Sequence, residues 1–396
     1  MVFKGKCVVL GVTGGIAAYK MANVASALRK KGAEVHVIMT KNATEFITPL
    51  TFETLTNNRC IVDTFDRNFQ YDVAHISLAK KADVMLIAPA TANVIAKMAH
   101  GLADDMLTTT VLAARCPKLV APAMNTAMLE NPATQDNLAR LEGYGFTVIP
   151  SEVGMLACKD VGSGKLPREQ VLLDYLEHTL QKKDLNGLRV TVTAGATREA
   201  LDPVRYLTNH STGKMGYALA RAAAMRGAQV TLIHGKTALE DVPFVTHVPV
   251  VSAQDMCQAV QEAFPQSDVL IMSAAVADYK PAQVADNKMK KSDGELSIPL
   301  ARTTDILGSL KNQKQPHQFI CGFSMETENL VANSRAKLEK KGLDMVVANN
   351  LKTPGAGFGV DTNVVTFITA DGTQDLPLME KSQVAEAILD QILAMK

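Results

Sequence analysis

The sequence predicts an α/β protein with two Rossmann-like domains, each built on a mainly parallel sheet. The stretches "KCVVLGVTGGIAAYKMANVASALRKKGAEVHVIMT" and "LRVTVTAGATREALDPVRYLTNHSTGKMGYALARAAAMRGAQVTLIHG" both have the pattern strand, glycine turn, helix, strand, the second with a longer insertion before its helix. Such units favour parallel pairing with a right-handed crossover. A chain of 396 residues is also long for one core and suits two or three domains.

The first unit begins with a buried apolar strand, Val8–Val12, which runs into Gly14 and Gly15. Apolar residues then recur at helical spacing over 21–28. Gly32 ends that helix, and "EVHVIM" is the next strand. In the second unit we expect a helix over 216–226 that ends at a glycine before the strand "QVTLIH".

A polar stretch, "QKKDLNG" at Gln181–Gly187, separates the two units. We therefore predict domains of residues 1–183 and 187–396. Short apolar runs, most of them flanked by polar residues, glycine or proline, predict further strands. They lie at 84–88, 119–121, 269–274, 319–322 and 345–348.

The composition excludes several classes of function. A net charge of +1 gives no global field to recruit nucleic acid or a membrane. The chain has no Trp and six Cys that form neither a CxxC pair nor a zinc spacing. We interpret the cysteines as reduced thiols of a cytoplasmic protein.

The strand ends of the first domain offer candidate ligand residues, because open α/β sheets bind ligands there. "GVTGG" lacks the GxGxxG pattern of a dinucleotide site, which disfavours a nicotinamide dehydrogenase. Gly14 and Gly15 suit either a phosphate at a helix start or a plain tight connection. Thr40 suits either a phosphate contact or a helix cap.

Two further strand ends read "APATAN", with Pro89, Thr91 and Asn93, and "APAMN", with Asn125. They are compatible with a flat ligand, but spacing alone favours ordinary strand exits. His75 is compatible with either a capping role or proton handling.

In the second domain, "NHSTGKMG" resembles a P-loop but fails its pattern, since Met215 follows Lys214 where Ser or Thr should stand. The turn at 211–213 is either a polar loop or a phosphate site at a helix start. Asp278, with the lysines from Lys288 onward, is either a solvated stretch or a contact to a triphosphate. Asn349 and Asn350 end a strand and are expected to face the same cleft.

The motifs "GVTGGIAAYK", "AHISLAKKADVMLIAPATANVIAKMAHGLADD", "APAMNTAM" and "ACKDVGSGK" occur in this order. Together they resemble the flavin-dependent cysteine decarboxylases, phosphopantothenoylcysteine decarboxylase among them. The second half resembles phosphopantothenate–cysteine ligase. The chain as a whole resembles the fused bacterial bifunctional enzymes of coenzyme A biosynthesis.

For the first half, the resemblance implies a flavodoxin-like domain that binds FMN. The FMN phosphate would lie at Gly14, Gly15 and Thr40, and its ring against residues 89, 91 and 93. Cys158 would donate a proton from a flap, with glycines 154, 162 and 164 as hinges. His75 and Asn125 would act at the carboxylate that leaves as CO2. A flavin-binding relative without catalysis is the alternative, and the presence of His75, Asn125 and Cys158 argues against it.

For the second half, the resemblance implies ligation of cysteine to 4′-phosphopantothenate through an acyl-cytidylate formed from CTP, with Mg2+. Asn209 and Arg205 would bind the intermediate, and Ala275 would face the cytosine. The expected CTP residues are Ser211, Ala275, Asp278, Lys288, Phe323, Lys337 and Lys341. The family also implies a homo-oligomer, with paired ligase domains and decarboxylase domains in trimers or larger assemblies.

Overall fold

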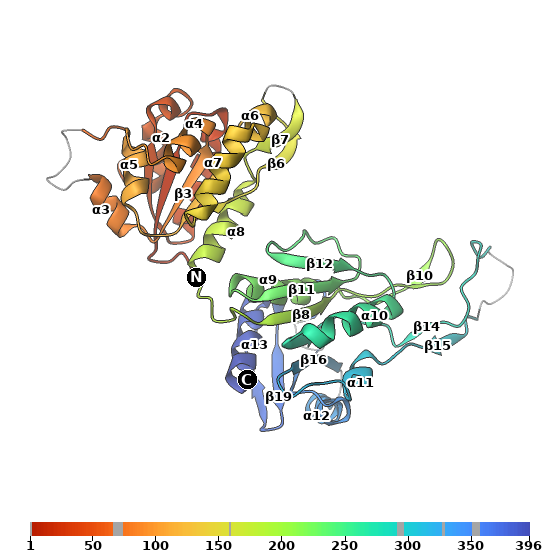
Figure 1. The fold of residues 1–396 in the computed structure, drawn as a ribbon. Coiled ribbons are helices and arrows are strands. Elements are labelled where there is room, and N and C mark those ends of the chain that lie inside the picture. The colour runs from red at the N-terminus through yellow and green to blue at the C-terminus, as the bar shows by residue number, and fades with distance from the viewer. Residues whose placement is uncertain (1, 66–73, 158–159, 291–296, 327–328, 351–356) are drawn as a thin grey trace. The chain divides into compact units, whose positions relative to one another are not determined.

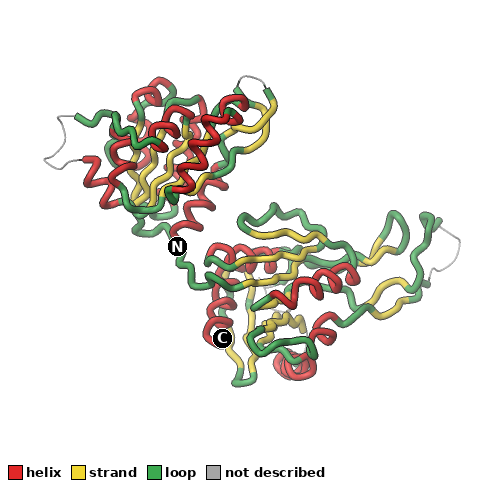
Figure 2. Tube along the Cα trace, viewed as in Figure 1, coloured by secondary structure: helices red, strands yellow, loops and turns green. Residues whose placement is uncertain are grey.

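The computed structural model describes residues 2–65, 74–157, 160–290, 297–326, 329–350 and 357–396. The chain divides into two compact units, Met1–Gln181 and Lys182–Lys396. In the described part of the chain, every helix is too short or too polar to cross a membrane. The predicted α/β class is confirmed, since each unit has a mainly parallel sheet with helices on both faces (Figures 1 and 2).

The first unit contains a five-stranded parallel sheet in the order β2-β1-β3-β4-β5. Its strands are β1 (Cys7–Val12), β2 (Glu34–Met39), β3 (Val84–Ala90), β4 (Lys118–Pro122) and β5 (Thr147–Val148). The chain leaves β1 toward β2 on one side and continues with β3 on the other. The point between β1 and β3 is therefore the switch point, where ligands of such sheets bind.

Helices cover both faces of this sheet because each has one apolar side. One core is shared with α1, α2 and α8, and the other with α3, α4, α5 and α7. The helical segments of the unit are η1 (Ile16–Lys20), α1 (Met21–Lys30), η2 (Lys41–Glu45), α2 (Pro49–Thr56), α3 (Ala74–Lys81), α4 (Ala92–Ala99), α5 (Met106–Ala113), α6 (Thr126–Glu130), α7 (Pro132–Gly143) and α8 (Glu169–Leu180). A 3-10 turn, η1, precedes α1, so the α-helix begins later than the glycine turn predicts.

A hairpin of β6 (Glu152–Met155) and β7 (Val161–Lys165) follows the sheet. The sequence predicts glycine hinges here, but Gly162 and Gly164 lie within β7 and pack on the turn after β4. A Cβ added at Gly164 would lie 2.2 Å from the carbonyl oxygen of Met124, so glycine is required for close packing.

The second unit contains an eight-stranded sheet in the order β12-β11-β8-β13-β16-β17-β19-β20. Its strands are β8 (Arg189–Ala194), β11 (Gln229–His234), β12 (Val245–Pro249), β13 (Val269–Met272), β16 (Phe319–Glu326), β17 (Met345–Asn350), β19 (Val365–Thr369) and β20 (Thr373–Asp375). The pairing is parallel from β12 to β17. The antiparallel edge of β19 and β20 was not foreseen from the sequence. Here the switch point lies between β8 and β13.

The helices of this unit again form two layers. One core contains α9 and α13, and the other contains α10, α11 and α12. The helical segments are α9 (Lys214–Met225), α10 (Ala253–Ala263), η3 (Phe264–Gln266), α11 (Ile306–Leu310), α12 (Leu330–Lys341) and α13 (Lys381–Met395). Short strands form separate pairs: β9 (Glu199–Ala200) with β10 (Tyr206–Leu207), β14 (Tyr279–Pro281) with β15 (Leu300–Arg302), and β18 (Thr362–Asn363) with β21 (Met379–Glu380). The first two pairs extend away from the sheet (Figure 1), and we call residues 199–207, 279–290 and 297–302 the arm.

Arg226 directly follows α9 and connects the end of that helix to the polar stretch Gln181–Gly187 and to α13. Its buried guanidinium donates to Asp184 Oδ1 at 2.8 Å and to Glu386 Oε2 at 3.1 Å, and lies 2.7 Å from Asp390 Oδ1. Burial raises the pKa of Glu386, and the positive charge of Arg226 opposes that rise.

We expect Arg226→Met to lower the free energy of unfolding of the second unit by about 1–2 kcal/mol near pH 8, because the partly buried carboxylates of Asp184 and Glu386 lose a buried guanidinium as their partner. The loss should be smaller near pH 5: a carboxyl with a raised pKa takes up a proton there and no longer carries an unpaired charge. Urea unfolding at both pH values measures the effect. Arg189→Met is the matched control, since its pair with Asp268 is about half exposed and worth less than about 1 kcal/mol.

Candidate functional sites at the strand ends of the two units

A cavity of about 610 Å³ opens at the switch point of the first unit. We call it the hairpin cavity, because the β6–β7 hairpin forms one wall and the turns after β1, β3 and β4 form the others. Its volume is that of a typical small-molecule site. Its lining residues are Gly14, Gly15, Ile16, Ala17, Tyr19, Lys20, Pro89, Thr91, Ala92, Ala123, Met124, Asn125, Met128, Met155, Leu156, Ala157, Gly164, Lys165 and Leu166.

Backbone and hydroxyl bonds fix the two strand ends that meet here. Thr13, which is fully buried, donates from its Oγ1 to the carbonyl of Pro89 at 2.6 Å and accepts from the amide of Thr91 at 3.0 Å. Thr91 in turn caps α4 by accepting from the amide of Val94. The sequence reasoning missed Thr13, although a polar residue at the end of an apolar strand was a usable signal.

Asn125 is oriented by the helix that follows it. Its Oδ1 accepts from the amide of Ala127 at 2.9 Å, which caps α6. The hairpin is bound to the same turn, since Met124 donates its amide to the carbonyl of Gly164 and Thr126 donates its hydroxyl to the carbonyl of Ser163. Turn and hairpin are therefore one connected wall of the cavity.

The other residues predicted for this site lie elsewhere. Thr40 does not line the hairpin cavity, but its buried Oγ1 has no partner in the described part of the chain. Asn93 is exposed on α4, two residues past the cap Thr91, and His75 is on α3. Neither lines the cavity. Cys158 lies outside the described residues, directly after Ala157, which lines the cavity.

A second cavity, of about 390 Å³, lies at the switch point of the other unit. We call it the α9 cavity, because it is lined by the start of α9 and the carboxyl ends of the strands. Of the predicted residues it brings together Asn209, Ser211, Ala275, Asp278, Phe323, Lys337 and Asn349. The sequence reasoning gave no ligand role to Lys214 and did not consider Lys381, and both line the cavity.

The approach of α9 to β8 requires a glycine. A Cβ at Gly216 would lie 2.5 Å from the Cβ of Ala194 and 2.8 Å from the carbonyl oxygen of Thr193. Gly213, with φ of 82°, is the N-cap of α9, and no side chain caps that helix end. The first-turn amides of α9 therefore remain suitable for an anion.

Ala275 differs from the expectation that its backbone would face a base. Its amide donates to the carbonyl of Gly195 at 2.9 Å, and its carbonyl accepts from the amide of Thr197 at 3.3 Å. The amide is thus already used to join the two strand ends at the switch point.

Arg205, Lys288 and Lys341 do not line the α9 cavity. Arg205, on the arm, donates to Asp202 Oδ2 at 2.6 Å and to the carbonyl of Met289 at 2.9 Å, and its hydrogen bond strongly lowers the pKa of Asp202. Lys288 is exposed on the arm. Lys341 pairs with Asp305, one helical turn beyond Lys337.

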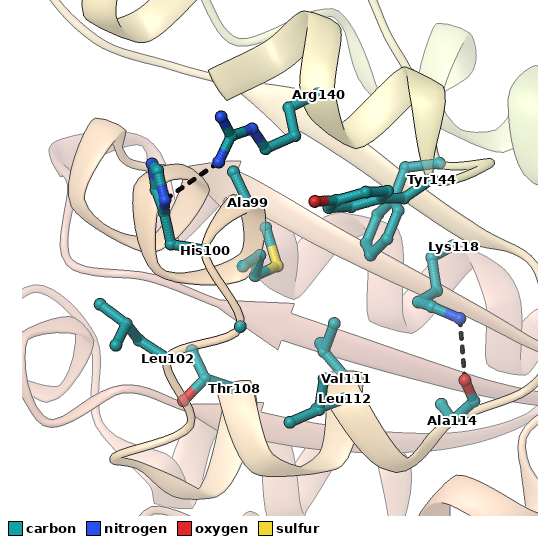
Figure 3. Close-up of a pocket in the computed structure, with 13 residues that line it drawn as sticks. Ala99, His100, Leu102, Thr108, Val111, Leu112, Ala114, Lys118, Arg140 and Tyr144 are labelled. Atoms are coloured by element: carbon teal, nitrogen blue, oxygen red, sulfur yellow. Dashed lines mark hydrogen bonds between the residues drawn. The ribbon is translucent and has the colours of Figure 1, made fainter. Parts of the chain in front are cut away.

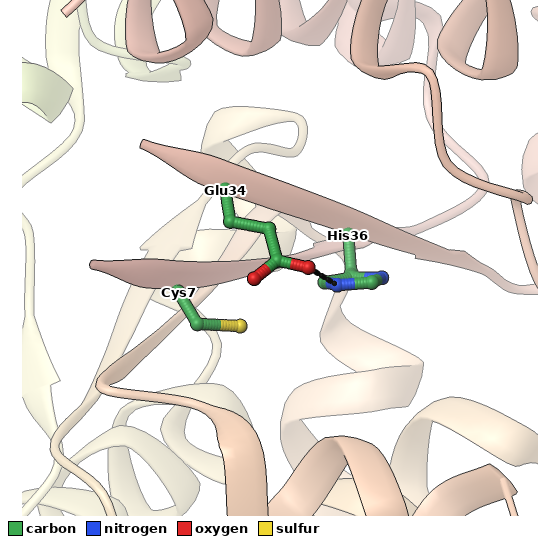
Figure 4. A group of neighbouring side chains, drawn as sticks. All are labelled: Cys7, Glu34 and His36. Atoms are coloured by element: carbon green, nitrogen blue, oxygen red, sulfur yellow. Dashed lines mark hydrogen bonds and ion pairs between the residues drawn. The ribbon is translucent and has the colours of Figure 1, made fainter. Parts of the chain in front are cut away.

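Two other features of the first unit hold none of the predicted site residues. A cavity of about 410 Å³ lies toward the amino end of β4, where Arg140 contacts His100 and Lys118 donates to the carbonyl of Ala114 (Figure 3). Cys7, Glu34 and His36 form a cluster at the amino ends of β1 and β2 (Figure 4). We assign no metal to it, because Glu34 already pairs with Lys81 and burial raises the pKa of Cys7 to about 11.

The five described cysteines, at 7, 60, 116, 257 and 321, are free thiols, as the sequence predicts.

Residues 3–181 match the family described as "Flavoprotein", and residues 185–395 match the "DNA/pantothenate metabolism flavoprotein C-terminal domain". The chain is 46% identical over 393 residues to the coenzyme A biosynthesis bifunctional protein CoaBC of Bacillus subtilis (strain 168), covering 98% of this chain and 97% of the relative. It is 41% identical over 397 residues to the same-named protein of Escherichia coli (strain K12), covering 99% and 98%. A solved C-terminal domain of a CoaBC is 43% identical and covers 54% of this chain and 98% of its own, with a TM-score of 0.47.

We expect Gly164→Ala to reduce flavin retention at least tenfold. Its φ is 113°, so alanine adds backbone strain of about 1–3 kcal/mol and a contact that displaces the hairpin from the turn of Met124. Flavin absorbance per chain after gel filtration measures the effect, and a melting curve checks folding. Gly143→Ala, with open space at its Cβ, is the control. A folded Gly164→Ala protein with full flavin would contradict the role of this contact.

Proposed function

The chain belongs to the CoaBC family, the bifunctional synthetase and decarboxylase of coenzyme A biosynthesis, and from this premise we propose which of its residues perform the two reactions. The observation that carries the proposal is that several of the residues expected for each activity, although not His75, Arg205 or Lys288, line one cavity within one unit. Gly14, Pro89 and Asn125 line the hairpin cavity, and Asn209 and Asp278 line the α9 cavity. The proposal includes the ligands of each cavity, the roles of the residues that line it and a cytoplasmic location.

We propose that the hairpin cavity binds FMN. The start of η1 after Gly14 and Gly15 suits its phosphate, and Pro89 and Thr91 suit its ring. Thr40, outside this lining, would reach the phosphate only through a shift of its buried hydroxyl. Bound flavin supplies the redox chemistry, taking electrons from the substrate's cysteine side chain and returning them after CO2 has left. The fit rests on the cavity's size and its mainly apolar rim.

The chain's own residues bind, orient and protonate. Because Ala127 fixes Oδ1 of Asn125, the donor side of the carboxamide has a defined direction, which suits a substrate carboxylate. Cys158 follows a residue that lines the cavity, and a thiol with an ordinary pKa of about 8.5 is mostly protonated at neutral pH, as a proton donor requires. The hairpin would exclude water from this wall.

His75 requires a second copy of the chain in this proposal. It is on α3 and does not line the hairpin cavity, although the family resemblance places it at the departing carboxylate. Assembly of the decarboxylase units, in trimers or larger oligomers, would bring His75 of one copy to the cavity of another.

We propose that the α9 cavity binds CTP and 4′-phosphopantothenate and ligates cysteine through an acyl-cytidylate. Ser211 and the start of α9 suit phosphate, while Phe323, Asp278 and Lys337 suit the rest of the nucleotide. Asn209 is oriented by the amide of Ser211, which donates to its Oδ1 at 2.9 Å. Mg2+ would accompany the triphosphate, and no protein ligand is assigned to it. Arg205 and Lys288, on the arm, would serve the site of a paired ligase unit.

Incubation with 4′-phosphopantothenate, cysteine, CTP and Mg2+, with products resolved by mass, tests both reactions. The wild type should release 4′-phosphopantetheine. Asn209→Ala should lower ligation by about a hundredfold or more, because an aligned donor at a reacting group is worth that much. Asn125→Ala should ligate normally and accumulate 4′-phosphopantothenoylcysteine.

Supplying 4′-phosphopantothenoylcysteine directly allows decarboxylation to be measured without ligation. Asn209→Ala should then decarboxylate it at the wild-type rate. Removal of Mg2+ with a chelator should stop ligation and leave decarboxylation unchanged. If Asn125→Ala decarboxylates at full rate, Asn125 has no part in the reaction; if no CTP is consumed by the wild type, the nucleotide assignment is wrong.

Mixed assemblies test the proposed sharing of His75. Chains with His75→Asn and chains with Asn125→Ala, each inactive in decarboxylation, should regain up to about a quarter of wild-type activity when co-expressed, because random mixing builds some sites with both native residues. Separately purified proteins mixed without subunit exchange are the control. Mixed assemblies that stay inactive would show that both residues act from one chain.

A further inference from the structure

Two lysines begin two helices at the same cavity. Lys214 is the first residue of α9, and Lys381 is the first residue of α13. The helices pack in one core, and both lysines line the α9 cavity. The start of α9 has no side-chain cap, whereas Glu380 caps α13. The cavity thus receives the positive end of one helix and a lysine charge from each of two helices.

Both ammonium groups hold the same segment, 357–361. Lys381 donates to the carbonyls of Gly357 at 3.0 Å and Val360 at 2.5 Å. Lys214 donates to the carbonyl of Gly359 and pairs with Asp361 Oδ1, each at 2.8 Å. An ammonium group has three hydrogens, so these carbonyl bonds leave each lysine with capacity for a further acceptor.

The site is short of negative charge. Lys381 is only 7% exposed, and burial, together with the nearby charge of Lys214, lowers its pKa, while Asp361 opposes the shift. Asp361 is itself mostly exposed, which weakens its compensation. Among the described residues that line the cavity, the charged ones are Lys214, Lys337, Lys381 and one acid, Asp278. A bound polyanion would supply the negative charge that the lining of the cavity lacks.

Asn349 gives a separate indication that a ligand completes this cavity. It is 6% exposed, lines the cavity, and its buried Oδ1 has no partner among the residues that the structure describes. Buried polar atoms normally have partners, so a donor from a ligand is expected there, such as a sugar hydroxyl or a metal-bound water.

We propose that Lys381 and Lys214 form a phosphate clamp, in which Lys381 contacts phosphate oxygens of the substrate while holding segment 357–361 at the cavity. The inference rests on the proposed assignment of this cavity to ligation. CTP and 4′-phosphopantothenate both carry phosphate. The geometry points to the triphosphate, because three lysines and a helix start match several charges better than one.

Lys381→Met in the full chain tests the clamp by calorimetric titration with CTP, CMP and 4′-phosphopantothenate in separate experiments with Mg2+. We expect CTP to bind at least tenfold more weakly, and CMP and 4′-phosphopantothenate to change less than twofold. The affinity for CTP should also fall less steeply with salt than in the wild type, which a purely structural role would not produce. Lys396→Met, at the far end of α13 and bonded to the carbonyl of His317, is the control.

Lys381→Gln separates charge from tethering, since its amide can still donate to a carbonyl. It should bind CTP as weakly as Lys381→Met. If only the binding of 4′-phosphopantothenate weakens, the clamp still exists, but it holds the phosphate of that substrate and not the triphosphate of CTP. Unchanged binding of all three ligands by folded Lys381→Met, or full CTP affinity in Lys381→Gln, would overturn the proposal. A wild type that binds no CTP would instead refute the assignment of the cavity to ligation.

Discussion

Close approach of backbone to backbone at strand ends is the constraint on which both cavities depend. In the second unit α9 comes so near β8 that a side chain at Gly216 would overlap Ala194. In the first unit β7 comes so near the turn after β4 that a side chain at Gly164 would overlap the carbonyl of Met124. These contacts bring a helix start and a hairpin against strand ends that already carry polar side chains. Without these close contacts, the polar side chains at the strand ends would not line one cavity.

Local sequence pattern predicts the strands, because apolar runs locate them, and it predicts that the carboxyl ends of parallel strands share one edge of a sheet. That Gly14, Pro89 and Asn125 would serve one ligand followed only from the family resemblance, since spacing alone favours ordinary strand exits at the last two. Position along a helix explains two of the differences. Asn93 lies past the cap of α4 and faces solvent, and Lys341 lies one turn beyond Lys337, where it reaches Asp305.

What the sequence could not predict depends on which elements pack together. Lys381 begins a helix far along the chain from Lys214, and no periodicity indicates that α13 lies beside α9. The edge strands β19 and β20 are short and pair antiparallel, so they lack the helix-strand alternation that predicts the rest. Ala275 is a third case, since its amide joins two strand ends, a use that only the pairing of β8 with β13 determines.

The two cavities suit different ligand chemistry because they present different groups at similar places in the fold. The hairpin cavity has an apolar rim that includes Tyr19 and Met155, as a flat ring system needs. The α9 cavity gathers lysines around an uncapped helix start, as a polyphosphate needs. In both, a residue expected at the chemistry lies outside the cavity, His75 on α3 and Arg205 on the arm. The guanidinium of Arg205 is already hydrogen-bonded to Asp202 on the arm, and Arg205 does not line the α9 cavity. The same close approaches of backbone that build each cavity therefore decide which of the expected residues line it, and His75 and Arg205 are not among them.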